Sequence, residues 1–198
     1  MLRFFDILGL IKTMKLSHLL LKKIKKIKLI VSDVDGVLTD GKIYLGGGSE
    51  ELKSFCARDA LPMEMAMRSG IKIIWFTGRK CGAVIRRSKE IDGDVKLLFK
   101  GDLYKQKINL LDVLCAEFKI KASEILYVGD DWNDLFIMRQ VGVSVTPLDG
   151  SAENKNVADI VTKASGGDGV MAEVVEIVMR AKGTWPKFIK GYTSDFLF

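Results

Sequence analysis

The 198-residue chain contains only three cysteines, three prolines and one histidine. The cysteines are too few and too scattered for a disulfide framework, and no two form a C-x-x-C pair, which argues against a zinc or redox site. We therefore expect reduced thiols. The low proline content and the 19 glycines exclude collagen-like and proline-rich chains. The single histidine, His18, is isolated in a lysine-rich segment, which argues against a nucleophile activated by histidine.

The chain also lacks an apolar run long enough to cross a membrane. Lysines interrupt the apolar stretches of residues 1–11 and 16–21, so neither reaches the roughly 18 residues that a membrane span needs. A secretory signal places charge before its apolar stretch, whereas here the lysines follow it. We therefore expect a cytoplasmic protein.

Charge is distributed unevenly along the chain. Residues 1–28 hold eight basic residues against one acidic residue, whereas the remaining 170 residues hold 23 basic and 24 acidic residues. The net charge of +6 therefore belongs to an N-terminal arm, residues 1–27, and we expect no nucleic-acid partner for the domain. Within the arm, residues 15–26 predict a basic amphipathic helix. We expect it to dock on the domain or on a neighbouring subunit, with contact to a membrane surface or nucleic acid as the alternative.

Short apolar runs alternate with helical patterns through the rest of the chain. The runs that predict strands are residues 28–32, 71–76, 95–99, 125–128, 143–145 and 157–161. The segments that predict helices are residues 61–69, 82–91, 105–118, 135–141 and 169–181. This alternation predicts an α/β fold in one domain, residues 28–182: a doubly wound, Rossmann-like parallel sheet flanked by helices.

Two further segments stand outside this alternation. Residues 42–45 and 52–55 flank three consecutive glycines and predict a β-hairpin. Residues 183–198 form an aromatic tail, and exposed aromatic rings suit a contact surface. We expect this tail to pack on a neighbouring subunit or to cover its active site.

Polar motifs follow three of the predicted strands, at the sheet edge where α/β proteins bind ligands. DVDGVLTDG (residues 33–41) follows the first strand, TGR (residues 77–79) the second and GDDWND (residues 129–134) the fourth, while residues 100–107 supply lysines. Carboxylates gathered in one crevice repel each other unless a hard cation such as Mg²⁺ binds them. A lysine and a hydroxyl beside that cation suit a phosphate group. One aspartate can then attack phosphorus, and another can protonate the leaving oxygen.

These four motifs, in this order, resemble those of the haloacid dehalogenase-type phosphatases over residues 28–180. A narrower match adds residues 43–44, 48–55 and 58–59 and resembles the 3-deoxy-D-manno-octulosonate 8-phosphate (KDO 8-phosphate) phosphatases. Members of that family lack a separate cap domain and form tetramers in which a hairpin flap closes the neighbour's site. The resemblance implies a homotetrameric, Mg²⁺-dependent phosphatase of lipopolysaccharide precursor synthesis, without a cap and with an aspartyl-phosphate intermediate. The short gaps around Thr77 agree with the missing cap.

The resemblance also implies roles for individual residues. Asp33 is the expected nucleophile and a metal ligand. Asp35 is the expected general acid and base, with its backbone carbonyl on the metal. Asp130 is a further metal ligand. Thr77 and Lys107 are expected to hold the transferring phosphoryl group.

Some assignments stay open on the sequence alone. Lys105 is the alternative to Lys107. The residues expected to bind the sugar-acid substrate are Arg58, Asp59, Arg79, Arg87 and Asp131. Cys56 and Ala60 replace an asparagine and a glycine that are usual in the family, so a nonulosonic (sialic-acid-like) 9-phosphate is an alternative substrate. A non-catalytic binding or oligomerisation module of the same fold is the remaining alternative.

Overall fold

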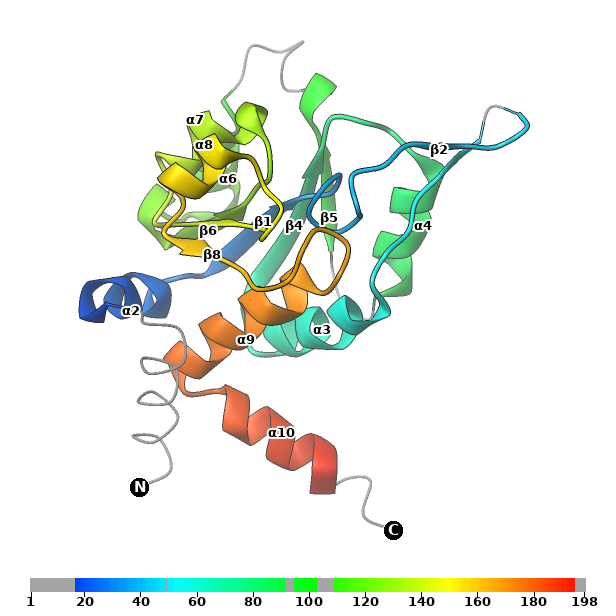
Figure 1. The fold of residues 1–198 in the computed structure, drawn as a ribbon. Coiled ribbons are helices and arrows are strands. Elements are labelled where there is room, and N and C mark those ends of the chain that lie inside the picture. The colour runs from blue at the N-terminus through cyan, green and yellow to red at the C-terminus, as the bar shows by residue number, and fades with distance from the viewer. Residues whose placement is uncertain (1–16, 49, 92–94, 103–108, 195–198) are drawn as a thin grey trace.

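Six strands form a parallel sheet in the order β5-β4-β1-β6-β7-β8 (Figure 1). The strands are β1 (Leu29–Asp33), β4 (Lys72–Thr77), β5 (Lys96–Phe99), β6 (Ile125–Val128), β7 (Val143–Thr146) and β8 (Ile160–Val161). The structure is a computed structural model that describes residues 17–48, 50–91, 95–102 and 109–194. The predicted doubly wound α/β fold is confirmed.

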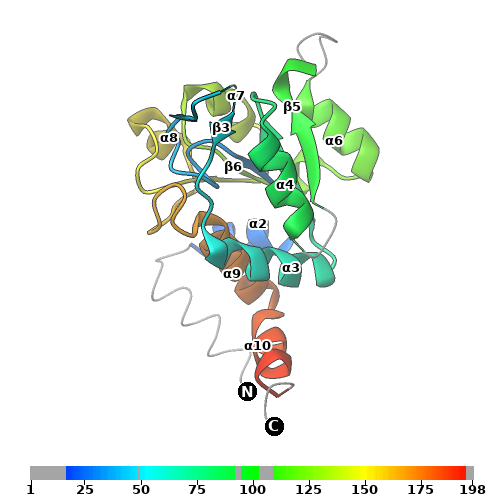
Figure 2. The ribbon, with the colours of Figure 1, turned by 90° about the vertical axis from the view of Figure 1, so that its right-hand side faces the viewer.

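Helices cover both faces of this sheet, which explains why its central strands β1, β4 and β6 are mostly apolar and almost entirely buried. In β1, Ile30 faces one buried cluster while Leu29 and Val31 face the other, as alternation along a strand requires. The helices on the Ile30 face are α2 (His18–Lys25), α3 (Ala60–Arg68), α4 (Gly82–Glu90) and α9 (Val170–Lys182). The opposite face is covered by α6 (Leu110–Phe118) and α7 (Leu135–Met138) (Figures 1 and 2).

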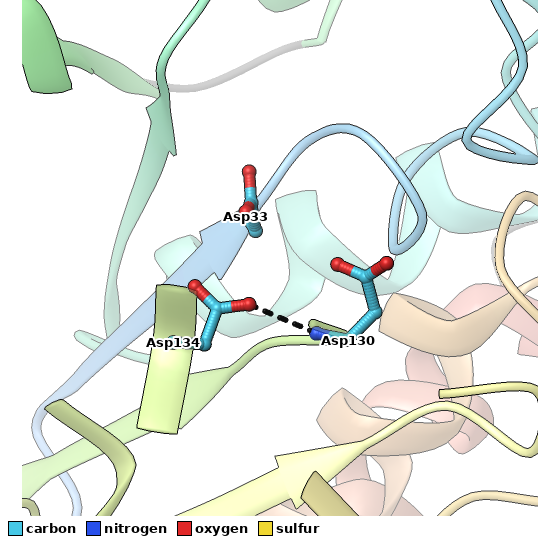
Figure 3. Close-up of side chains that lie close together, drawn as sticks. All are labelled: Asp33, Asp130 and Asp134. Atoms are coloured by element: carbon cyan, nitrogen blue, oxygen red, sulfur yellow. Dashed lines mark hydrogen bonds between the residues drawn. The ribbon is translucent and has the colours of Figure 1, made fainter. Parts of the chain in front are cut away.

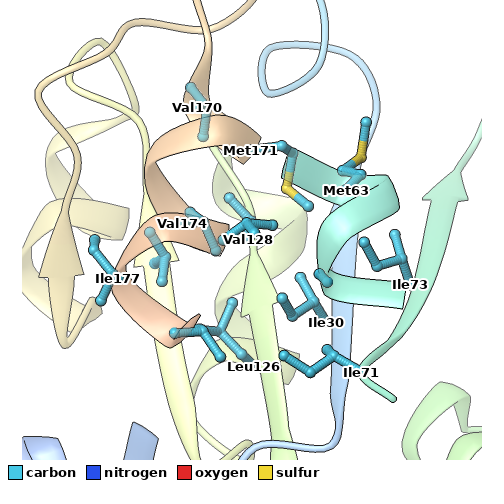
Figure 4. Packing of buried hydrophobic residues seen from close by; sticks show 14 of the residues in the cluster. Ile30, Met63, Ile71, Ile73, Leu126, Val128, Val170, Met171, Val174 and Ile177 are labelled. Atoms are coloured by element: carbon cyan, nitrogen blue, oxygen red, sulfur yellow. The ribbon is translucent and has the colours of Figure 1, made fainter. Parts of the chain in front are cut away.

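The larger cluster forms where α9 lies against the sheet (Figure 4). Side chains from β1 and β6 meet one stripe of α9 that repeats with helical spacing. The buried residues of this contact are Ile30, Leu126, Val128, Val170, Met171, Val174 and Ile177. Each fully buried aliphatic side chain of this kind stabilises the fold by about 1.5–3 kcal/mol. This packing fixes the N-terminus of α9 close to the loops that follow β1.

The lysine-rich N-terminal segment contributes to the same cluster. The helix predicted for residues 15–26 is observed as α2, and the Ser17 hydroxyl caps it by accepting a hydrogen bond from the Leu20 N–H at 3.1 Å. Leu21, Ile24 and Ile27 are buried, and α2 packs on α9. The segment therefore shares its core with the sheet, while the lysines of α2 face outward.

A short hairpin projects from the domain (Figure 1). Its strands, β2 (Tyr44–Leu45) and β3 (Glu51–Leu52), pair antiparallel and are shorter than the predicted segments of residues 42–45 and 52–55. Phe55, just after the hairpin, stacks on Trp75 of β4 with ring centroids 6.1 Å apart. The hairpin is thus anchored to the sheet at its C-terminal end.

Two helices differ from the sequence prediction. Helix α8 (Ala152–Val157) was not predicted, and it includes the first residue of the strand predicted for residues 157–161. The Ser151 hydroxyl caps this helix by accepting a hydrogen bond from the Asn154 N–H. Helix α10 (Trp185–Ser194) forms within the aromatic tail, with Pro186 in its first turn, where proline is favourable. It leaves the end of α9 remote from the hairpin (Figure 1).

The helix predicted for residues 105–118 is observed as α6, and residues 103–108 lie outside the described residues. None of the helices in the described part of the chain combines the length and apolar composition that a membrane crossing needs.

Candidate active site

The strand order brings two of the sequence motifs side by side. From β1 the chain continues outward through β4 and β5 on one side, and later through β6, β7 and β8 on the other. Such a reversal opens a crevice at the carboxyl ends of the two strands that flank it. Asp33 ends β1, and Asp130 follows β6 by two residues, so both lie at this crevice.

Three carboxylates converge there (Figure 3). One oxygen each of Asp33, Asp130 and Asp134 lies within 4.8 Å of the other two. Oxygen donors gathered in this way suit a hard divalent cation. The sequence analysis placed Asp134 in its motif but gave it no role. The structure brings it to the same point as Asp33 and Asp130, two of the three predicted ligands, whereas a metal contact of the third, the Asp35 carbonyl, stays a prediction.

Asp134 is held in place through both of its oxygens. The Tyr127 hydroxyl donates to Oδ1 at 2.7 Å, and the Asp130 N–H donates to Oδ2 at 3.0 Å. Both Tyr127 and Asp134 are buried. Asp134 ends the short 3-10 helix η3 (Trp132–Asp134) and precedes α7, so its side chain joins this helix to the backbone that carries Asp130. It therefore fixes the position of the neighbouring ligand.

The three carboxylates disfavour one another's charge. Burial raises the pKa of Asp33 well above its ordinary value, and the charge of Asp134 raises it further. Burial and the charge of Asp134 raise the pKa of Asp130 to about 7. Burial also raises the pKa of Asp134, although the hydrogen bonds that its carboxylate accepts from the Tyr127 hydroxyl and from the Asp131 and Asp130 N–H groups oppose this. A cation at this point would reverse both effects, so the residues present fit a divalent metal ion.

Backbone packing holds the loop after β1 close to these carboxylates. Gly36 has a φ of +83°, a conformation that favours glycine, and a Cβ atom there would overlap the carboxylate of Asp130. The backbone of Gly166 lies against the Gly36 carbonyl, since a Cβ on Gly166 would overlap it as well. The loop before α9 therefore supports the loop after β1, which carries Asp35, the predicted general acid.

Thr77 lies beside Asp33 at the end of the adjacent strand. In the β1–β4 register Asp33 is opposite Phe76, so Thr77 is one residue beyond. Its side chain is buried, and Oγ1 accepts a hydrogen bond from the Arg79 N–H at 3.1 Å. Lys105 and Lys107 lie outside the described residues, so the choice between them stays a prediction.

A chain of opposite charges joins the hairpin to the predicted general acid. Lys53 Nζ forms ion pairs with Asp35 and, at 2.8 Å, with Glu51 Oε1. Glu51 Oε2 accepts from Arg79 Nη2 at 2.8 Å. The Lys53 side chain is only 1% exposed. The sequence analysis included Lys53 and Glu51 in a family motif but assigned no function to either.

The predicted substrate-binding residues lie in two different surroundings. Asp59 is buried at the N-terminus of α9, and its Oδ1 accepts from the Ala172 N–H at 2.8 Å. Burial raises the pKa of Asp59 to about 6, although the Ala172 hydrogen bond and the charges of Arg58 and Arg87 oppose this. Asp131 is exposed and caps η3, accepting from the Trp132 N–H at 2.8 Å. Contact between these residues and a substrate stays a prediction.

Comparison with known proteins agrees with this geometry. A family model described as haloacid dehalogenase-like hydrolase matches residues 102–174. The chain is 36% identical over 161 residues to the 3-deoxy-D-manno-octulosonate 8-phosphate phosphatase KdsC of Escherichia coli K12, covering 81% of this chain and 84% of that protein.

Two solved structures share the fold at similar identity. A probable YrbI family phosphatase from Pseudomonas syringae superposes with a TM-score of 0.81 at 34% identity, covering 89% of this chain and 98% of that one. The KDO 8-phosphate phosphatase of Moraxella catarrhalis, solved with magnesium ion, phosphate ion and KDO, superposes with a TM-score of 0.80 at 32% identity, covering 87% of this chain and 97% of that one.

The fold, the carboxylate cluster and these similarities define the class. The chain is a phosphoric monoester hydrolase of the haloacid dehalogenase-like type. Within this class it belongs to the family of the 3-deoxy-D-manno-octulosonate 8-phosphate phosphatases. The family predicted from the four motifs is confirmed, and the magnesium cofactor implied by that family agrees with the acidic cluster.

Proposed function

We propose that this protein is a Mg²⁺-dependent phosphatase that hydrolyses KDO 8-phosphate to KDO and inorganic phosphate in the cytoplasm. The observation that carries the proposal is the place of Asp33, which ends the central strand with a carboxylate oxygen within 4.8 Å of oxygens from Asp130 and Asp134. The relatives from Escherichia coli and Moraxella catarrhalis are named for this reaction, which supports the choice of substrate.

Phosphoryl transfer then proceeds in two steps through Asp33 and Asp35. In the first step, a carboxylate oxygen of Asp33 bonds to phosphorus while the bond from phosphorus to the sugar oxygen breaks. The sugar oxygen keeps the electron pair and takes a proton from Asp35. In the second step, a water oxygen bonds to phosphorus and gives a proton to Asp35. The bond from phosphorus to Asp33 breaks, which releases inorganic phosphate and restores the carboxylate.

Asp33, Asp130 and Asp134 would hold the metal ion. When bound there, Mg²⁺ supplies positive charge against the carboxylates and the phosphoryl oxygens. The raised pKa values of Asp33 and Asp130 support this assignment, because a positive charge beside them would favour the ionised form of both groups. Thr77 and Lys107, or Lys105 in its place, would donate hydrogen bonds to the phosphoryl oxygens.

We also propose that the protein is a homotetramer in which the hairpin contacts a neighbouring subunit. Three apolar side chains of the hairpin support this proposal: Ile43 is 54% exposed, Leu45 79% and Leu52 56%. Neighbouring apolar side chains with this exposure are typical of interaction surfaces. Light scattering of the purified protein tests the assembly. A Leu45→Ser, Leu52→Ser double variant should have a lower mass, and a wild-type protein with the mass of one chain would contradict the proposal.

Phosphate release tests the reaction itself. The purified protein is given KDO 8-phosphate, a nonulosonate 9-phosphate and p-nitrophenyl phosphate, each with Mg²⁺ and with EDTA. We expect the highest kcat/KM for KDO 8-phosphate, with no turnover in EDTA or in the Asp33→Asn variant. A preference for the nonulosonate would keep the mechanism and change the substrate. Activity retained in Asp33→Asn would refute the aspartyl-phosphate route.

A further inference from the structure

We infer that Lys53 is a positioning residue that holds the Asp35 carboxyl group in place for proton transfer to the sugar oxygen. The inference rests on the proposed function, because it assumes that Asp35 is the general acid. Lys53 lies on the hairpin side of the molecule, directly after β3 (Glu51–Leu52), whereas Asp35 lies on the loop after β1. The contact between them joins two segments that are 18 residues apart in the chain.

Lys53 is suited to fix a carboxylate rather than to bind a substrate. Its side chain is only 1% exposed, which leaves almost no surface for a ligand to touch. An ammonium group has three N–H donors, and its two described partners are the carboxylates of Asp35 and Glu51. Any effect of Lys53 on the reaction therefore has to pass through these carboxylates.

Glu51 fixes Lys53 in turn. Its Oε1 lies 2.8 Å from Lys53 Nζ, and its Oε2 accepts from Arg79 Nη2 at 2.8 Å. The Cys81 thiol also donates to the Glu51 carbonyl oxygen at 3.4 Å. Arg79 and Cys81 belong to the loop after β4, so the lysine is held from the sheet as well as from the hairpin.

The ion pair with Lys53 holds one oxygen of the Asp35 carboxyl group. Asp35 is partly exposed, with 28% of its side chain accessible, so it lies at the boundary between the protein and the crevice. Without Lys53, one of its oxygens would lose the ion pair that directs the carboxyl group. A general acid that is misplaced by about 1 Å can lose on the order of 100-fold in rate.

The size of this effect depends on the leaving group, and this dependence separates a positioning role from a structural one. A sugar alkoxide leaves poorly and needs a proton from Asp35, whereas p-nitrophenolate leaves without one. A general loss of folding or of metal would slow both reactions by the same factor. A loss of the general acid's position would slow the sugar phosphate selectively.

The test uses Lys53→Met and Lys53→Arg, with Lys28→Met as a control for the loss of a lysine ion pair away from the site. Lys28 also forms an ion pair, 2.7 Å from Glu124, but it precedes β1 at the opposite edge of the sheet. For Lys53→Met we expect kcat/KM for KDO 8-phosphate to fall on the order of 10- to 100-fold. For p-nitrophenyl phosphate we expect a fall of less than about 3-fold, because that reaction does not need the acid. The control should match the wild type on both.

Lys53→Arg keeps the charge but changes its shape, so we expect the same selectivity with a smaller loss, about 3- to 10-fold. If Lys53→Met does not give a folded circular dichroism spectrum, this variant decides alone. The inhibition constant of the product KDO should stay within about twofold in either variant, because Lys53 does not touch the sugar. Equal losses on the two substrates, a raised inhibition constant or no loss at all would each overturn the inference.

Two further variants separate this inference from the proposed function. If Asp33→Asn is active, the proposed function fails whatever Lys53 does. If Asp35→Asn lowers kcat/KM equally for both substrates, Asp35 is not the acid and the inference fails with that part of the mechanism, because kcat/KM reports the step in which the leaving group departs and not the later attack of water. If Asp35→Asn is selective for the sugar phosphate and Lys53→Met is not, only the role of Lys53 is refuted.

Discussion

Replacing Asp59 by asparagine should make the stability of the protein less dependent on pH. Asp59 is 2% exposed, and its Oδ1 accepts from the Ala172 N–H, while its buried Oδ2 has no hydrogen bond of good geometry among the described residues. The charges of Arg58 and Arg87 only partly offset its burial. An asparagine keeps an oxygen for the Ala172 N–H and has no charge to bury.

The magnitude follows from the pKa of Asp59. The carboxyl has an ordinary value of 3.8, and burial raises its pKa in the folded protein to about 6. At 1.36 kcal/mol for each pKa unit, this difference corresponds to about 3 kcal/mol. The folded state holds its proton more tightly, so unfolding releases a proton between about pH 4 and pH 6. The free energy of unfolding therefore falls as pH rises through that range, and the loss is complete above about pH 6.

Urea unfolding followed by circular dichroism measures this effect. Wild type and Asp59→Asn are compared at pH 4.5, 5.5, 6.5 and 7.5, in EDTA and at one protein concentration, so that metal binding and assembly do not contribute. Relative to the wild type, the variant should gain roughly 2 kcal/mol between pH 4.5 and pH 7.5. Asp168→Asn, at an exposed site in the loop before α9, is the control and should follow the wild type. Parallel curves for wild type and Asp59→Asn would refute the reasoning.

Three other predictions concern the metal site and the C-terminal helix. Gly36→Ala should raise the Mg²⁺ concentration for half-maximal activity at least about tenfold, because the alanine Cβ would displace the Asp130 carboxylate. Gly70→Ala is the control for backbone strain, since Gly70 also has a positive φ, +88°, but a Cβ atom there would meet no neighbouring atom. Asp33→Asn should raise the Tm measured in EDTA, because it removes one of three carboxylates that repel each other. The variant should also lose the increase in Tm that Mg²⁺ gives to the wild type. A lower Tm than the wild type in EDTA would contradict this prediction. Trp185→Ala should lower the free energy of unfolding by about 1–2 kcal/mol in urea titrations, since the indole ring packs on the core beneath the Arg180 guanidinium. An unchanged urea midpoint would contradict a stabilising role of this contact.

The sequence predicts most of the sheet because its strands are buried on both faces. A strand such as residues 125–128 is apolar at every position, and this pattern is visible without any knowledge of its neighbours. The short helices are harder to predict. Helix α8 depends on the Ser151 cap, and the periodicity of six residues is too short to distinguish it from a strand.

The candidate site is predictable where its residues follow strands directly. The common location of Asp33, Thr77 and Asp130 follows from the order of the motifs, because a parallel sheet brings the carboxyl ends of its strands to one edge. The roles of Asp134 and Lys53 do not follow in this way. Asp134 depends on the Tyr127 hydroxyl, and Lys53 depends on how the hairpin folds back over the loop after β1.

The candidate active site joins two segments that differ in local stability: the central strand β1 and the hairpin. β1 is hydrogen-bonded to a strand on each side, so its amide protons should exchange with solvent only when the whole domain opens. The hairpin has two strands of two residues each, with largely exposed side chains, and it can open in a smaller fluctuation. Asp33 therefore belongs to the most persistent cooperative unit, while Lys53, which contacts Asp35, belongs to one of the least persistent. Warming the protein would release Asp35, the proposed proton donor, from its contact with Lys53 before it disturbs Asp33, the proposed nucleophile.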